Sequence, residues 1–164
     1  MTSDVRHFEM LILEGAQAGL SWETILNKRE NYRKAFERFD PRKVARFTPR
    51  RVEKLLKNPG IVRNRLKIES AVSNARAFLR VQKEFGSFNR YVRGFDGEEK
   101  VRRRFRTPKE YPTRTAESDA LSKDLKKRGF RFVGTTIVYA YLQAVGLVDD
   151  HVMGCFVGRE NSRS

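Results

Sequence analysis

The stretch Leu125–Thr136, LKKRGFRFVGTT, decides how the rest of the chain folds around it. A basic helix is expected to stop at Gly129, because glycine commonly follows the last turn of a helix. A second helix, rich in apolar residues, begins at Thr135 or Thr136, since threonine is a favoured residue at a helix start. The short segment between them therefore predicts a tight, glycine-bounded hairpin that joins two helices.

The start of the helix after this hairpin has the chemistry of an anion site. The first backbone N–H groups of a helix lack intrahelical partners and lie at the positive end of its dipole. Gly134 has no side chain to hold a phosphate away from them, so Gly134, Thr135 and Thr136 are candidate DNA-backbone contacts. The neighbouring cations are Lys123, Lys126, Lys127, Arg128 and Arg131. An ordinary helix–helix turn with a solvated basic face explains the same residues equally well.

The charge of the whole chain agrees with a polyanion partner. Lys and Arg total 35 against 20 Asp and Glu, which gives a net charge of +15 and a pI near 10.4. Such a balance indicates nucleic acid before an acidic membrane surface. A structural basic protein that binds RNA is the remoter alternative.

Outward from the hairpin, apolar residues recur at helical spacing along nearly the whole chain. Asp40-Pro41 and Thr48-Pro49 each put a capping side chain before a proline, as at a helix start. No alternating strand pattern is present, and an irregular loop is expected over residues 94–115. We therefore predict one compact all-α domain of short helices over residues 1–164. Its longest helix is expected to end near Gly86. One face of that helix is formed by Ile68, Val72, Ala75 and Leu79.

Composition excludes several other classes of protein. Hydrophobic residues make up 39% and charged residues 34%, which is too apolar for a disordered chain and too charged for a membrane protein. The longest run without a charge, residues 132–148, is shorter than the roughly 20 apolar residues of a membrane span. Cys155 is the only cysteine, so no disulfide can form within the chain. These features predict a cytoplasmic protein with no membrane partner. A monomer is the default expectation for its oligomeric state.

A second segment, Leu13–Trp22, puts a carboxylate inside an apolar helix. Glu14 has apolar neighbours, and a buried carboxylate is costly unless it is paired or used. Gly15 and Gly19 are expected to weaken or end this helix before Trp22, the only tryptophan. A carboxylate beside an aromatic side chain can bind a flat, electron-poor ring, because the carboxylate accepts hydrogen bonds and the aromatic ring stacks on it. The spacing alone favours the alternative, a glutamate paired with a nearby arginine and a tryptophan in the core.

A third segment, near the C-terminal end, contains His151 and Cys155 four residues apart. At this spacing, one turn of a helix can present both side chains to a metal. Two ligands do not make a zinc site, and His7 is the only other histidine. Asp149 and Asp150 in the same segment can instead cap a following helix.

Together and in this order, these segments resemble the constitutive bacterial DNA-3-methyladenine glycosylases, which belong to the helix-hairpin-helix glycosylase superfamily. The likeness covers nearly the whole chain and is weakest over residues 85–115. It implies an all-α, helix-hairpin-helix glycosylase-like fold. It also implies a base-excision-repair enzyme that flips N3-methyladenine out of double-stranded alkylated DNA and hydrolyses its glycosidic bond. The stretches that carry it are FEMLILEGAQAGLSW (8–22), KRENYRKAFERF (28–39), GIVRNRLKIESAVSNARA (60–77) and SDALSKDLKKRGFRFVGTTIVYAYLQAVGLVDDHVMGC (118–155).

The resemblance also implies roles for single residues. Glu14 corresponds to the family's base-recognising carboxylate, and Trp22 corresponds to the aromatic residue that stacks on the flipped base. Gly19 and Leu20 fall on the loop that fills the gap left in the base stack. The hairpin at Gly134 corresponds to the family's phosphate-binding hairpin.

Two further implications concern the ends of the chain. His151 and Cys155 correspond to two of the four ligands of a structural zinc. Family members begin with a further segment, ahead of the position of Phe8, that supplies the other two ligands and part of the base pocket. We therefore expect a chain truncated at its N-terminus relative to the family, for which the alternative function is a catalytically impaired, non-enzymatic DNA-binding module. Asp149 lies near the position of a carboxylate that stabilises the oxocarbenium ion in related glycosylases, so its catalytic role is a hypothesis.

Overall fold

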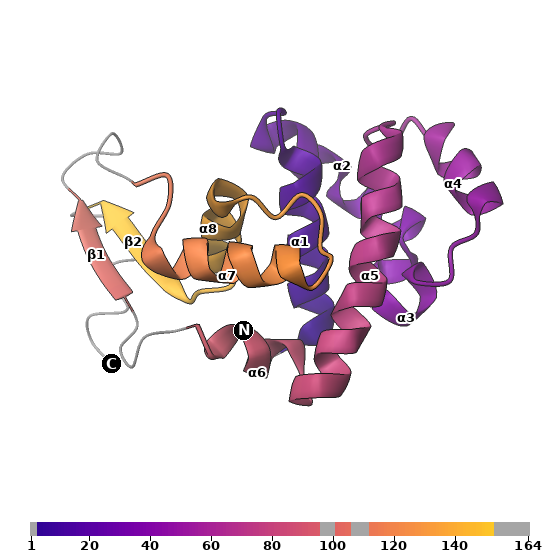
Figure 1. The fold of residues 1–164 in the computed structure, drawn as a ribbon. Coiled ribbons are helices and arrows are strands. Elements are labelled where there is room, and N and C mark those ends of the chain that lie inside the picture. The colour runs from indigo at the N-terminus through magenta and orange to yellow at the C-terminus, as the bar shows by residue number, and fades with distance from the viewer. Residues whose placement is uncertain (1–2, 96–100, 106–111, 153–164) are drawn as a thin grey trace.

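The computed structural model describes residues 3–95, 101–105 and 112–152, and helices form most of them (Figure 1). No helix in this part of the chain is long and apolar enough to cross a membrane. The strands are β1 (Val101–Phe105) and β2 (Val148–Val152). The helices are α1 (Asp4–Gln17), α2 (Trp22–Ala35), the short 3-10 helix η1 (Glu37–Phe39), α3 (Pro41–Val44), α4 (Pro49–Leu56), α5 (Arg65–Phe85), α6 (Phe88–Arg93), α7 (Ala116–Lys127) and α8 (Thr135–Ala144).

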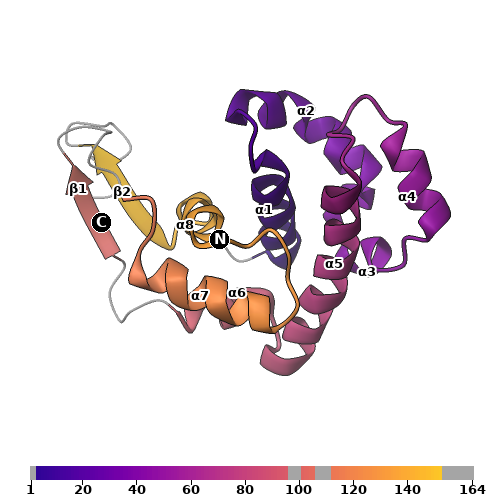
Figure 2. The ribbon, with the colours of Figure 1, turned by 45° about the horizontal axis from the view of Figure 1, so that its top comes forward.

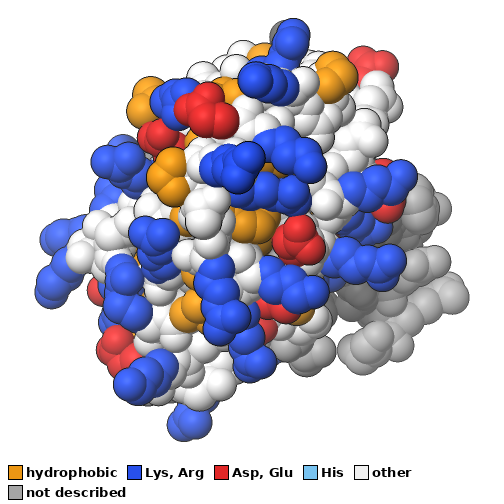
Figure 3. All heavy atoms as spheres, turned by 90° about the vertical axis from the view of Figure 1, so that its right-hand side faces the viewer, with side chains coloured by type: hydrophobic (Ala, Val, Ile, Leu, Met, Phe, Trp, Pro, Cys, Tyr) orange, Lys and Arg blue, Asp and Glu red, His pale blue; other side chains and the backbone are white. Residues whose placement is uncertain are grey.

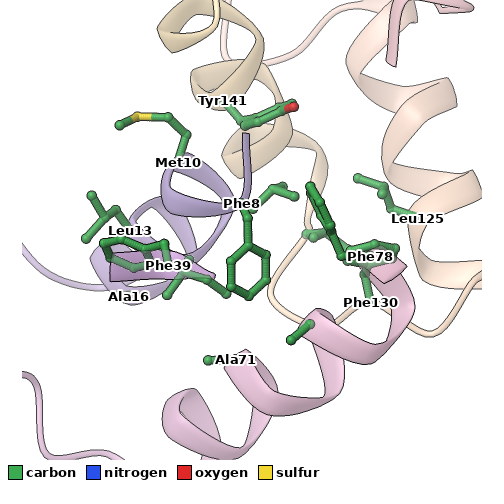
Figure 4. Close-up of a cluster of buried hydrophobic side chains, with 14 of the residues drawn as sticks. Phe8, Met10, Leu13, Ala16, Phe39, Ala71, Phe78, Leu125, Phe130 and Tyr141 are labelled. Atoms are coloured by element: carbon green, nitrogen blue, oxygen red, sulfur yellow. The ribbon is translucent and has the colours of Figure 1, made fainter. Parts of the chain in front are cut away.

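Helix α1 forms the centre of the molecule, in contact with α2, α5, α6 and α8. Its residues His7–Ala16 are all buried, and the run Met10–Leu13 at its middle is apolar on every side. Phe8 meets Phe78 of α5 edge to face, with ring centroids 5.2 Å apart, and Phe78 stacks on Phe88 of α6 at 4.1 Å. Phe130 joins the same cluster from the hairpin (Figure 4). The core therefore links α1, α5 and the hairpin directly.

The predicted helix starts and the end of the long helix are confirmed. Asp40 Oδ1 accepts the N–H of Arg42 at 2.9 Å before α3, and Thr48 Oγ1 accepts the N–H of Arg51 at 3.3 Å before α4. Helix α5 ends at Gly86, whose φ of 84° lies in the left-handed region that favours glycine. These features were predictable because each depends on residues within one turn.

The irregular loop predicted over residues 94–115 was wrong in part, because β1 lies within it. Strand β1 pairs with β2 in parallel, with Val101 opposite Val148 and Phe105 opposite Val152. The expectation that residues 149 and 150 cap a following helix was also wrong, since both lie in β2. The sequence of β1, VRRRF, has no apolar alternation, and its partner lies far away along the chain. Local pattern therefore gives no indication of this pairing.

The prediction that Gly15 and Gly19 weaken or end the first helix is confirmed at Gly19, whereas Gly15 lies inside the helix. Helix α1 continues through Gly15 to Gln17, and the chain turns only afterwards, at Gly19 with φ of 78°. The reason for Gly15 is packing against the hairpin. A Cβ at this position would lie 3.3 Å from Phe132 Cβ, tighter than ordinary van der Waals contact. Glycine thus lets α1 and the hairpin approach closely.

Candidate nucleic-acid and base-binding site

The hairpin between α7 and α8 begins with a left-handed glycine, as predicted. Gly129 has a φ of 91°, and the N–H of Phe130 donates to the carbonyl of Leu125 at 3.0 Å. This pairing satisfies a carbonyl at the end of α7, and glycine takes the required conformation without strain. Phe130 is buried beside Phe88. The hairpin is therefore fixed at its first residues.

A buried amide from α5 holds the middle of the hairpin. Asn74 Nδ2 donates to the carbonyl of Arg131 at 2.9 Å, and Asn74 Oδ1 accepts the N–H of Arg131 at 2.8 Å. Ser122 Oγ of α7 donates to the carbonyl of Val133 at 2.6 Å. Sequence reasoning missed Asn74, although a polar residue on the buried face of α5 was the available indication. Figure 2 shows the hairpin passing between α5 and α1.

The start of α8 is open toward solvent. Gly134 is the residue before the helix, and it has no side chain that could cap the first turn. Its φ of −61° and ψ of 157° suit any residue, and a Cβ there would meet nothing within 4 Å. The Thr135 hydroxyl donates to Asp119 of α7 and lies 3.1 Å from Ser118 Oγ. Because its hydroxyl is already bonded, Thr135 can offer an anion only its backbone N–H. Thr136 is exposed, so its side chain is accessible as well.

The predicted cations divide into two groups. Lys123, Lys126 and Lys127 are exposed on α7 beside the hairpin. Arg128 instead donates from Nε to Asp124 at 2.6 Å and from a terminal nitrogen to Glu84 at 2.7 Å. These two carboxylates raise the pKa of Arg128 above its ordinary value, and Glu84 has the larger effect. Its contact with DNA remains a prediction, and its visible partners tie α7 to α5.

Glu14 is buried in α1, and none of the described residues forms an ion pair with it. It is 1% exposed, and its Oε2 has no hydrogen-bond partner among the described residues. Burial raises the pKa of Glu14 to about 8. The alternative of a Glu14–arginine pair is therefore wrong for this part of the chain.

Glu9, on the same helix, has the arrangement that Glu14 lacks. It is 5% exposed, and its Oε1 accepts from Arg29 Nε at 2.9 Å and from Arg33 Nε at 3.0 Å. Burial alone would raise the pKa of Glu9, but the two guanidinium groups outweigh that effect and lower it. Of these two buried carboxyls on one helix, Glu9 is already paired with arginines, and Glu14 is the one available to bind a ligand.

The loop after α1 carries the other candidate base contacts. Gln17 Nε2 donates to the carbonyl of Leu20 at 2.6 Å, which closes the turn at Gly19. The side chains that follow face outward: Leu20 is 37% exposed and Trp22, the first residue of α2, is 36% exposed. The alternative of a core tryptophan is therefore wrong. An exposed aliphatic residue beside an exposed indole is a suitable surface for unstacked bases.

The start of α5 joins this loop to the hairpin. Lys67 Nζ donates to the carbonyls of Ala16 and Ala18, at 2.9 and 2.7 Å. The preceding residue, Leu66, is 61% exposed and borders a shallow groove whose other wall is the hairpin. Sequence reasoning missed both residues, because a lysine beside an apolar residue at a helix start has no distinctive pattern.

The predicted zinc ligands fall largely outside what the structure describes. Cys155 lies outside the described residues, and the structure gives the backbone of Asp149 and His151 in β2 but not their side chains. His7 is occupied in the core, with Nδ1 2.6 Å from the Tyr141 hydroxyl and Nε2 3.1 Å from Asn89 Oδ1. Among the described residues, no group of three or more metal-binding side chains is present. The described part therefore does not complete a zinc site, and the roles of Asp149, His151 and Cys155 stay predictions.

Comparisons with known proteins agree with this arrangement. A family model described as methyladenine glycosylase matches residues 1–158. DNA-3-methyladenine glycosylase 1 of Escherichia coli (strain K12) is 51% identical over 154 residues, which cover 94% of this chain and 82% of that protein. DNA-3-methyladenine glycosylase of Haemophilus influenzae is 45% identical over 148 residues, covering 90% of this chain and 80% of that protein.

Solved structures show the same relationship in three dimensions. A crystal structure of 3-methyladenine DNA glycosylase I is 50% identical and has a TM-score of 0.91, covering 95% of this chain and 86% of the other. A Staphylococcus aureus 3-methyladenine DNA glycosylase I structure, which addresses 3-methyladenine recognition, has a TM-score of 0.91 at 35% identity, with coverages of 95% and 83%. The predicted all-α fold class is confirmed, with the β1–β2 pair as its exception. Since the family model spans nearly all of the chain and close relatives share its fold, this chain belongs to the methyladenine glycosylase family.

Proposed function

We propose that this protein is a DNA glycosylase that flips N3-methyladenine out of alkylated DNA and releases it by hydrolysis. The observation that carries the proposal is the Glu14 carboxyl, which is buried and whose Oε2 has no partner among the described residues, whereas Glu9, buried on the same helix, binds two arginines. Family membership supports the same reaction, because both curated relatives are named DNA-3-methyladenine glycosylases.

The chemistry of the lesion matches such a carboxyl. Methylation at N3 gives the adenine a positive charge, so its bond to the sugar is already weakened. The enzyme must extrude this base and position water, and it needs no strong acid to protonate the leaving group. A cation beside Glu14 would stabilise the carboxylate and lower its raised pKa toward ionisation. Selectivity for a charged lesion can therefore replace catalytic power.

The remaining parts of the site hold the DNA. The exposed Leu20 can enter the gap left by the extruded base, while Trp22 can stack on that base. The open helix start at Gly134 and the exposed lysines of α7 can bind the phosphate backbone without reading sequence. We expect the enzyme to act on double-stranded alkylated DNA as a monomer.

The test incubates the 164-residue chain with methylated duplex DNA and measures the free 3-methyladenine released by chromatography. We expect release under single-turnover conditions from methylated DNA and none from the same DNA left unmethylated. Circular dichroism shows that the chain is folded, and a mobility-shift assay measures its binding to the duplex. A folded chain that binds the duplex but releases no base would contradict the proposal, and a DNA-binding module would then describe the protein.

A further inference from the structure

The positive charge of this protein is concentrated in one part of the chain. Residues 28–65 contain 14 Lys and Arg against 4 Asp and Glu, a net charge of +10 out of +15 for the whole chain. Figure 3 shows the side of the molecule with α3, α4 and α5, where Lys and Arg side chains gather. We define the α3–α4 face by five exposed cations that have no ion pair among the described residues: Arg42, Lys43, Arg46, Arg50 and Lys54.

This face is separate from the hairpin. Arg65, Glu69 and Arg76 recur along α5 at helical spacing and border a groove shared with α4. A different side of α5 meets the hairpin, through Leu66 beside its groove and Asn74 bound to Arg131. The α3–α4 face therefore extends the positive surface beyond the site assigned to the lesion.

We propose that the α3–α4 face is a second nucleic-acid-binding surface, which contacts duplex phosphates away from the lesion. Cations without partners are free to replace counterions along a backbone, and such contacts hold a protein on DNA of any sequence. A membrane surface fits less well, because an interfacial helix needs an outward apolar face. The apolar side chains Val52 and Leu55 of α4 point into the core instead.

The experiment uses a long undamaged duplex, so its outcome does not depend on base release. The variant R42Q/R46Q/R50Q removes three charges from the α3–α4 face. The matched control K83Q/R90Q/R93Q removes three exposed cations that also lack ion pairs in the described part of the chain. Each phosphate contact adds roughly 0.9 to the size of the slope of log affinity against log salt. We therefore expect this slope to fall in size by about 2–3 for the first variant and to stay unchanged for the control.

Equal slopes for the two variants would overturn the proposal. Loss of binding to phosphatidylglycerol vesicles with an unchanged DNA slope would overturn it in favour of a membrane. Base release from a short methylated duplex is expected to be the same in wild type and both variants. Failure of wild-type release would instead count against the proposed function and leave the slopes interpretable.

A second inference concerns Lys67 and rests on the proposed function. Its ammonium group donates to the carbonyls of Ala16 and Ala18, at and just beyond the end of α1. Carbonyls at a helix C-terminus lack intrahelical partners and lie at the negative end of the dipole, so a cation there stabilises them. Ala18 is the residue before Gly19 and Leu20, which form the tip of the loop. One side chain of α5 thus fixes the base of this loop.

We infer that Lys67 is a positioning residue that holds the loop in the geometry needed to fill the base stack. Leu20 can occupy the gap only if the backbone beneath it stays in place, because small misplacements in a reacting complex lower rates strongly. Lys67 itself is half-buried under the loop and touches neither the extruded base nor the water in this scheme. Its effect should therefore appear in base extrusion rather than in bond cleavage.

The test compares K67M, K67R and the control K83M, an exposed lysine at the far end of α5. We expect K67M to slow single-turnover release about 10-fold from an intact methylated duplex. The loss should be less than about 2-fold when the lesion faces a one-nucleotide gap, because its base is then already poorly stacked. K67R should recover most of the rate, and K83M should match wild type. An equal loss on both duplexes, or no recovery by K67R, would show a merely structural role.

Discussion

Replacing Glu14 by Gln should reduce single-turnover release of 3-methyladenine by about 100-fold or more and, at the same time, raise the melting temperature. A hydrogen bond to a charged group is worth about 1.5–3 kcal/mol, and the extruded cation loses this interaction with the neutral amide. In the absence of DNA the carboxyl is buried and its Oε2 is unpaired within the described structure. The amide cannot ionise, so the substitution removes the free-energy cost of keeping this buried carboxyl protonated, about 1–2 kcal/mol, and should raise Tm by about 2–8 °C.

The raised pKa of Glu14 adds a pH dependence to the same prediction. Its pKa rises from an ordinary 4.5 to about 8 in the folded protein, so the folded state keeps a proton that the unfolded state releases. Stability from this group is therefore present below about pH 4.5 and is lost as the pH rises through about 8. The difference in Tm between E14Q and wild type should widen over that range in thermal melts at several pH values.

Glu9 supplies the matched control on the same helix. Glu9→Gln leaves Arg29 and Arg33 without their shared carboxylate, so it should lower Tm while base release stays within a few-fold of wild type. Retention of full base release by E14Q would contradict the base-binding role of Glu14. A fall in Tm for both variants would show that Glu14 is a structural group like Glu9.

Replacing Gly134 by Asp should leave the fold stable and reduce affinity for duplex DNA on the order of 100-fold. Aspartate is a preferred residue before a helix start, and its carboxylate would accept the free N–H groups of α8. The φ and ψ of Gly134 allow this side chain, and its Cβ would meet no atom within 4 Å. The same carboxylate would occupy the space for a phosphate and repel it, which removes contacts worth about 1.5–3 kcal/mol each.

The control for this substitution is Gly134→Ala, which adds a methyl group without a charge. Its Tm should match wild type, and its affinity should fall only a few-fold, because the methyl group hinders the phosphate slightly. Fluorescence anisotropy with a labelled duplex measures affinity, and thermal melting measures stability. Wild-type affinity in G134D would show that the start of α8 does not bind the backbone.

Much of the fold was predictable because local rules decide it. The end of α7 shortly before Gly129, the start of α8 at Thr135 and the end of α5 at Gly86 each follow from residues within one turn. The run Met10–Leu13, apolar on every side, accounts for the central position of α1. The pairing of β1 with β2 was not predictable, because it joins distant segments and one of them carries three consecutive arginines.

The site was predictable only where a residue type is unusual in its setting. Glu14 in an apolar helix was a candidate, but its spacing alone favoured a glutamate paired with arginine. That pairing belongs to Glu9 instead, whose arginines come from another helix. Asn74 and Lys67 were missed for the same reason, since their partners are backbone groups of distant segments. The hairpin cations looked alike in sequence, and only the structure shows that Arg128 binds Glu84 and Asp124.

Helix α5 constrains how the length of this protein can change. Lys67 holds the loop after α1 and Asn74 holds the hairpin, and both belong to one uninterrupted helix. At 1.5 Å per residue, the two anchors lie about 10 Å apart along its axis. A single inserted or deleted residue between them would turn one anchor about 100° relative to the other and break a contact. The stretch from Lys67 to Asn74 can therefore accept substitutions on its outer side, whereas its number of residues is fixed by what it holds at each end.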